Sequence, residues 1–212
     1  IEGSSRSAVT DGGIFSWTSG DAISVWNGSS KITYTYSGND NVFNPSSGSS
    51  TNISGYAVYP DGNHTNLSGS SFPTVNLKSS YNYGSTNAIM LAKVQGNSNN
   101  LTFSHLGGLM RFVIKDIPSD ADSFTFTANS GITGNFQVET QDDGTNIIEA
   151  TNVNSNNSVT INFKAGQTTE RTFYVPLPIG TYAGFTIRVG NNCSYNSPAT
   201  NTINRRTLLL MP

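Results

Sequence analysis

The sequence predicts an all-β protein, and three observations lead to that prediction. Ser (29), Thr (24), Asn (26) and Gly (21) together make up 100 of the 212 residues. Side chains of Ser, Thr and Asn compete with the backbone hydrogen bonds of a helix, and glycine loses more backbone entropy there than other residues. Short apolar segments alternate with polar residues, and turn sequences separate them. No apolar repeat at helical spacing runs through a window long enough for a helix.

Alternation of period two gives the clearest strand signal. Ile32, Tyr34 and Tyr36 alternate with threonines, which predicts a strand with one aromatic face. The same pattern recurs in three later segments, Phe124/Phe126, Val159/Ile161/Phe163 and Phe185/Ile187/Val189.

Shorter apolar runs predict the remaining strands, and polar stretches predict the loops. The runs lie at 22–26, 56–59, 88–94, 109–114, 173–177 and Leu208–Met211, and Leu101, Phe103 and His105 share one face of a further strand. Asn27-Gly28, Asp61-Gly62 and Asp143-Gly144 are typical of tight turns. Residues 44–52, 63–71, 96–100 and 151–157 are expected to be loops.

The strands are expected to form two tandem antiparallel β-sandwich lobes. Pro118 follows a strong apolar run, lacks a ladder donor and disfavours regular structure around it, so it marks a boundary. The expected lobes are residues 1–117 and 118–212. One large β-sandwich with a long connection is the alternative.

Composition excludes several classes of protein. Lys and Arg number 11 and Asp and Glu 13, giving a net charge of -2, so there is no basic excess to bind nucleic acid. Cys193 is the only cysteine, which rules out an intrachain disulfide. No segment comes close to the run of about 18 apolar residues that a membrane-spanning helix needs. Scarce charge with abundant Ser, Thr and Asn favours an exported surface protein.

No pattern in the sequence predicts catalysis, a metal site or a cofactor. His64 lies near one carboxylate, Asp61, and zinc sites need three or four protein ligands. His105 shares a strand face with apolar residues, so a structural role is expected. No Gly-x-Ser-x-Gly motif occurs, and none of the few acidic residues lies in a recognisable hydrolase motif. A hydrolase would require a Ser or Asp close to one of the two histidines.

Aromatic residues on a polar β surface are candidates for stacking on sugar rings. We consider Trp17, Trp26, Tyr81 and Tyr83 for this role. The plainer interpretation is that such rings fill the sandwich cores.

A linear order of short motifs resembles the fimbrillin-like proteins of Bacteroidetes, the subunits and accessory proteins of type V pili. The resemblance covers nearly the whole chain. Its motifs, in order, are Arg6-Ser7-Ala8-Val9-Thr10, Phe15 to Val25 with Trp17 and Gly20-Asp21, Gly55 to Pro60, Ala88 to Ala92, Leu101 to Leu106, Phe173 to Pro178, and Arg205 to Leu210.

This resemblance implies a transthyretin-like first lobe and assembly by strand exchange. In the family, an exported lipoprotein precursor is cut after an arginine near its start, and a strand of the next subunit fills the vacated groove. Arg6 lies where the processed arginine is expected. Only residues 1–5 precede it and none is cysteine, so lipidation and cleavage of a precursor stay open. Leu208, Leu209, Leu210 and Met211 form a closing strand or, on the sharper hypothesis, a donor strand.

The expected function is therefore a non-enzymatic fimbrial subunit or fimbria-associated adhesin at the cell surface. Its partners would be other fimbrial subunits and host or bacterial glycans or proteins, with no nucleic acid. Contact with the outer membrane would come only through a lipid anchor on the precursor. A carbohydrate-binding surface module is the alternative function.

Overall fold

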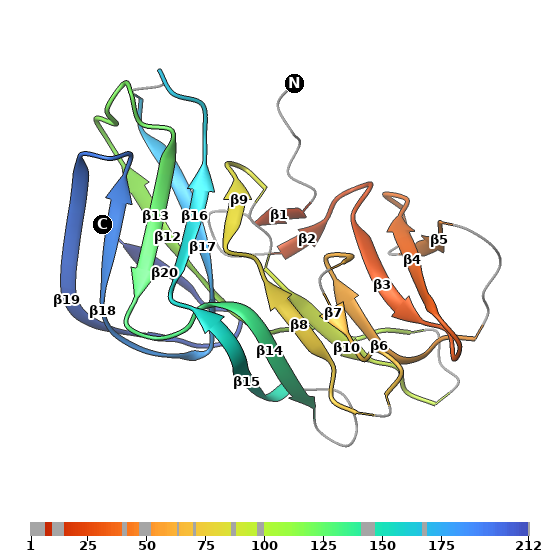
Figure 1. Cartoon of the computed structure of the whole chain (residues 1–212). Coiled ribbons are helices and arrows are strands. Elements are labelled where there is room, and N and C mark those ends of the chain that lie inside the picture. Colours follow the sequence, from red (N-terminus) through yellow and green to blue (C-terminus); the bar gives the residue numbers. More distant parts are fainter. Residues whose placement is uncertain are drawn as a thin grey trace.

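A computed structural model gives the fold of the chain (Figure 1). It describes residues 7–9, 15–39, 42–46, 52–62, 64–69, 71–85, 88–96, 100–140, 147–166 and 169–211. Within these ranges the regular structure is entirely β, in several mainly antiparallel sheets. The all-β prediction is confirmed, and so is the β-sandwich architecture.

The first sandwich packs a six-stranded sheet against a four-stranded sheet. The six-stranded sheet has the order β11 (Ser104–His105), β10 (Met90–Lys93), β6 (Ser54–Tyr59), β3 (Ala22–Trp26), β4 (Lys31–Tyr36) and β5 (Phe43–Pro45). The four-stranded sheet has the order β15 (Ile147–Asn156), β14 (Thr133–Thr140), β8 (Thr74–Leu77) and β7 (His64–Thr65). Tyr56, Val58 and Leu91 of the first sheet meet Val75 and Phe136 of the second in one buried cluster.

The second sandwich packs a five-stranded sheet against a three-stranded sheet. The five-stranded sheet has the order β19 (Cys193–Ile203), β18 (Gly180–Val189), β13 (Ser123–Ala128), β16 (Ser158–Asn162) and β9 (Ser80–Asn82). The three-stranded sheet has the order β17 (Arg171–Pro178), β12 (Gly107–Ile114) and β20 (Leu208–Met211). Phenylalanines fill its core: the rings of Phe124 and Phe173 stack with centroids 4.4 Å apart, and those of Phe126 and Phe185 with centroids 5.3 Å apart.

The two sandwiches share strands across the expected boundary at residue 117. β14 and β15 follow this residue in the chain, yet β14 pairs with β8 of the first half. β9 precedes it, yet pairs in parallel with β16 of the second half. In Figure 1, β8 and β9 lie between the two groups of strands. The sheets therefore do not follow the division into 1–117 and 118–212, and separate folding of those two halves stays a prediction.

The chain changes sandwich at Leu106, between β11 and β12. Glycine is required directly after this point, because a Cβ on Gly107 would lie 1.9 Å from the carbonyl oxygen of Leu177. That oxygen belongs to the backbone of β17, which pairs with β12. The close approach of the two backbones leaves no room for a side chain.

The four alternating segments of the sequence are strands with one buried face. β13, for example, buries Phe124 and Phe126 and leaves the residues between them partly exposed. The expected loop at 151–157 was wrong, because 151–156 belong to β15. β19 was missed as well. Both are edge strands rich in polar residues, and backbone pairing with β14 and β18 holds them without an apolar pattern. Asp143-Gly144 lies outside the described residues.

Replacing Phe126 with alanine should strongly destabilise the second sandwich. Its ring is fully buried, and truncating a buried phenylalanine typically costs about 3–5 kcal/mol. Urea unfolding followed by circular dichroism measures the change. Tyr195→Ala is the control: this ring is 58% exposed, so its loss should change the free energy of unfolding by no more than about 0.5 kcal/mol. Equal effects of both substitutions would contradict the core assignment.

Gly107→Ala should disrupt the pairing of β12 with β17 and lower the thermal unfolding temperature by several degrees or more. Gly180→Ala is the matched control, because a Cβ there would lie an ordinary 3.6 Å from the hydroxyl oxygen of Tyr182. Differential scanning fluorimetry compares the two variants. A Gly107→Ala protein as stable as the Gly180→Ala protein would show that the two backbones can separate at little cost.

Candidate functional site

An apolar groove lies on the face of the six-stranded sheet that is turned away from the four-stranded sheet. Ile23, Val25 and Tyr34 from β3 and β4 line it, and the segments 42–45 and 100–103 contribute to its walls. Its cavity volume is about 520 Å³. The groove belongs to a second cluster of apolar side chains on this sheet, separate from the core between the two sheets.

Trp17 packs across this groove. Trp17 is the last residue of β2 (Phe15–Trp17), which pairs with β1 (Ser7–Val9). Its indole makes edge-on contacts with Phe43 and Tyr59, each with centroids 5.0 Å apart, and with Phe103 at 5.7 Å. The half-buried Trp17 ring is therefore part of the apolar cluster of the groove.

The turn before β3 fixes the position of Trp17 relative to the sheet. Asp21 is fully buried, and its Oδ2 accepts a hydrogen bond from the backbone N–H of Thr18 at 2.8 Å. Its Oδ1 accepts one from the hydroxyl of Tyr59 at 3.2 Å. Gly20 has a φ of 93°, which suits glycine. The sequence motif Gly20-Asp21 thus forms the turn from which β3 begins, which is a structural role.

The strand Leu208–Met211 lies at the edge of the three-stranded sheet. It pairs in parallel with β12, and Leu209 and Met211 pack against the phenylalanine core. Leu210 is 57% exposed. In this structure β20 closes the second sandwich with one apolar face inward, and its second face consists of Leu208 and Leu210.

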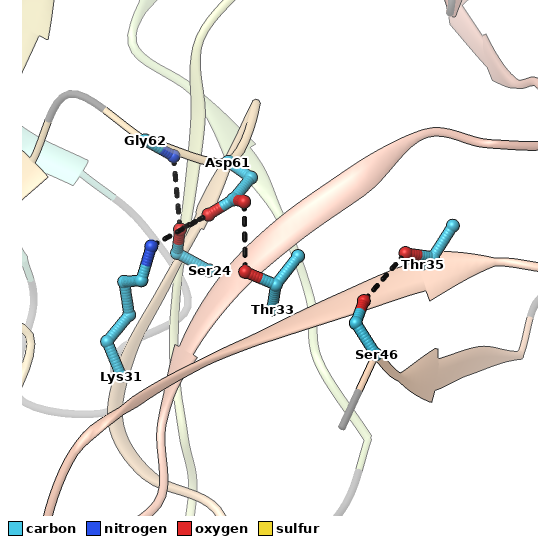
Figure 2. A network of polar contacts seen from close by, with 7 residues as sticks. All are labelled: Ser24, Lys31, Thr33, Thr35, Ser46, Asp61 and Gly62. Atoms are coloured by element: carbon cyan, nitrogen blue, oxygen red, sulfur yellow. Dashed lines mark hydrogen bonds and ion pairs between the residues drawn. The ribbon is translucent and has the colours of Figure 1, made fainter.

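A polar network surrounds Asp61, directly after β6 (Figure 2). The hydroxyl of Ser24 donates to Oδ1 of Asp61, Lys31 Nζ lies 3.3 Å from the same atom, and Thr33 Oγ1 donates to Oδ2 at 2.9 Å. The backbone N–H of Gly62 donates to Ser24 Oγ at 3.2 Å. Burial acts to raise the pKa of Asp61, but the hydrogen bonds and the charge of Lys31 outweigh it, so the pKa lies below its ordinary 3.8.

Both histidines are half-buried and have lowered pKa values. His64 lies on β7, not in a solvated loop as expected; burial is the main cause of its lowered pKa, and the charge of Lys31 adds to it. Burial, and then the charge of Arg206, lower the pKa of His105 from 6.5. Among the described residues, no group of three or more His, Cys, Asp and Glu side chains could hold a metal ion.

The other three candidate stacking residues lie in different environments. Trp26 is half-buried and packs against the core of the first sandwich. Tyr81 is buried, and burial raises its pKa to about 12. Tyr83 is 39% exposed, but the guanidinium carbon of the buried Arg171 lies 4.6 Å from its ring centroid. The four rings do not form one planar patch, and a glycan-stacking role stays a prediction for each.

Arg6 and Cys193 are two further residues that stand out in the sequence. Arg6 lies outside the described residues. Cys193 is an exposed free thiol at the start of β19. Within the part of the chain that the structure describes, no helix is long and apolar enough to cross a membrane.

Comparisons with known proteins give one structural neighbour. No protein-family model matches the sequence, and no curated protein matches it. The crystal structure of a putative cell adhesion protein from Bacteroides ovatus ATCC 8483 is similar, with a TM-score of 0.48 and 14% sequence identity. The similarity covers 94% of this chain and 85% of that one.

The protein should lose stability as the pH falls below about 6.5, because the unfolded state then binds more protons at His64 and His105 than the folded state does. A lowered folded-state pKa gives stability that is complete above the unfolded pKa and declines as the pH falls. Thermal unfolding at pH 8, 7, 6 and 5 should show little change between 8 and 7 and a decline below. Asp61 adds to the decline only below its ordinary 3.8. The double variant His64→Gln, His105→Gln should lose most of the decline between pH 7 and 5; an undiminished decline would contradict this assignment.

Proposed function

We propose that this chain is a non-enzymatic fimbrial subunit or fimbria-associated adhesin of a bacterial cell surface, which assembles with other subunits by β-strand exchange. The apolar groove on the outer face of the six-stranded sheet carries the proposal. A groove of this kind can accept an extended segment of another chain, whose alternate side chains fill it. Export through a lipidated precursor, and processing after Arg6, belong to the same proposal.

The acceptor is the groove lined by Ile23, Val25 and Tyr34. Its apolar walls and its volume of about 520 Å³ suit side chains of leucine size. The two-stranded sheet of β1 and β2 begins directly after Arg6, and Trp17 at its end packs into the apolar cluster of the groove. Removing the segment before β1 would therefore change the chain next to the acceptor.

The donor is the strand Leu208–Met211. All four residues are apolar, so either face of the strand can fill an apolar groove. One face already packs against the core, whereas Leu210 on the other face is 57% exposed. Strand exchange would bury this face as well, and burial of apolar surface is the main favourable contribution to such association.

Polymer formation by designed variants tests the proposal. The protein is treated briefly with an Arg-specific protease, and polymers are detected by size-exclusion chromatography and by unboiled gel electrophoresis. Leu210→Asp should lower the polymer fraction roughly tenfold or more, because an unpaired carboxylate would enter an apolar groove. Val153→Asp is the matched control: Val153 is 56% exposed on β15, and its replacement should leave polymer formation unchanged.

Two outcomes would contradict the proposal. Absence of polymers from the treated wild-type protein would exclude assembly after processing. Polymers from Leu210→Asp in the wild-type amount would exclude Leu208–Met211 as the donor. Deletion of residues 207–212 adds a check: a folded monomer without polymers supports donation, whereas an unfolded monomer would make β20 a closing strand only.

A further inference from the structure

A polar pocket with a volume of about 300 Å³ lies where the two sandwiches meet. The loop after β6 contributes Pro60 and Asp61, β8 contributes Asn76, and β9 contributes Ser80 and Asn82, so the pocket combines residues of both sandwiches. Its volume is at the lower end of the range for small-molecule sites, which occur preferentially at domain interfaces. The apolar groove of the strand-exchange proposal has an entirely different lining.

Two side chains in this pocket are held in place and still have hydrogen-bonding capacity. A carboxylate offers about four acceptor positions. Asp61 uses three of them, for Ser24, Thr33 and Lys31, so one remains. Asn76 is held through its amide nitrogen, which donates to Asn135 Oδ1 at 2.8 Å and leaves its own carbonyl oxygen as an acceptor.

Hydrogen-bond donors line the same pocket. Ser80 Oγ accepts a hydrogen bond from Asn162 at 2.9 Å, so its hydroxyl proton can be donated to a ligand. Lys78 and Asn82 line the pocket with side chains that are exposed and make no hydrogen bond or ion pair with the described residues. The Lys78 ammonium supplies donors only, whereas the Asn82 amide supplies both a donor and an acceptor.

Apolar surface and charge balance narrow the class of ligand. Pro60, Tyr81 and Ile89 also line the pocket and give it an apolar wall. Its described lining residues include two charged side chains, the carboxylate of Asp61 and the ammonium of Lys78. An anion such as phosphate would gain little from one ammonium next to a carboxylate, and Ca²⁺ or Mg²⁺ would find a single charged ligand.

We propose that this pocket binds one neutral sugar ring, with its hydroxyl groups on Asp61, Asn76, Lys78 and Asn82 and its C–H face against the apolar wall. A pyranose presents adjacent hydroxyl groups that both donate and accept, which matches a pocket lined by both acceptors and donors, with one carboxylate and one ammonium among its described residues. The ring would contact the loop after β6 and the segment that joins the two sandwiches. The proposal adds a ligand class to a surface protein, and it does not depend on strand exchange.

Saturation-transfer difference NMR on the intact monomer tests the proposal. The probes are the methyl glycosides of glucose, galactose, mannose and N-acetylglucosamine at millimolar concentration, with glucuronic acid and glucosamine as charged comparisons. At least one neutral glycoside should receive saturation, and the charged sugars should compete with it poorly. Lys78→Ala with Asn82→Ala should weaken the binding about tenfold or more, since the hydrogen bonds of both side chains to the sugar are lost.

Lys164→Ala with Asn191→Ala is the matched control, because both residues are exposed and lie outside the pocket. This variant should bind as the wild-type protein does. The proposal is overturned if no neutral glycoside receives saturation, if the Lys78 and Asn82 double variant binds unchanged, or if a charged sugar binds more tightly than every neutral one. Because the experiment uses the monomer, sugar binding can be measured even if strand exchange does not occur.

Discussion

The segment from β8 to β9 is the constraint on which the rest of the fold depends. Within a few residues, Thr74–Leu77 pairs with β14 in the first sandwich and Ser80–Asn82 pairs with β16 in the second. Each sandwich is therefore completed by strands from the opposite half of the chain. Because the ladder hydrogen bonds of both sheets run through this segment, the two sandwiches are tied together at the place where the polar pocket lies.

The same constraint determines which face of the six-stranded sheet has no full covering sheet among the described residues. β14 and β8 cover one face and bury Val58 and Leu91 against Phe136. The other face keeps apolar residues such as Val25 and Tyr34 beneath a groove, covered in part by Trp17. A sheet with two apolar faces needs a cover on both, and within the described part of the chain a full sheet covers only one of them. This asymmetry is the physical reason for placing the acceptor there.

The sequence predicts a strand well where one of its faces is buried. It predicts a strand poorly where only backbone hydrogen bonds to a neighbouring strand hold it in place. The alternation of β4 and β13 follows from burial of Tyr34 and of Phe126, so it is visible in the sequence. β15 and β19 are polar edge strands that exist because β14 and β18 offer them a ladder, and no side-chain pattern records this. The groove and the pocket were not predictable either, because both depend on strand pairing between segments distant in the chain. The Asp21 turn was predictable, since it is local.

The protection of the sheet edges separates β20 from the other outermost strands of the two sandwiches. Short edges such as β7, β9 and β11 offer few free backbone groups. Pro45, Pro176 and Pro198 lie in the edge strands β5, β17 and β19, where a missing N–H discourages pairing with another chain, and β15 contains Glu149. β20 has neither proline nor charge, and its four residues are all apolar. In a chain with few lysines and glutamates, this unprotected edge is the strand best suited to pair with a second subunit, which is why the donor assignment falls on Leu208–Met211.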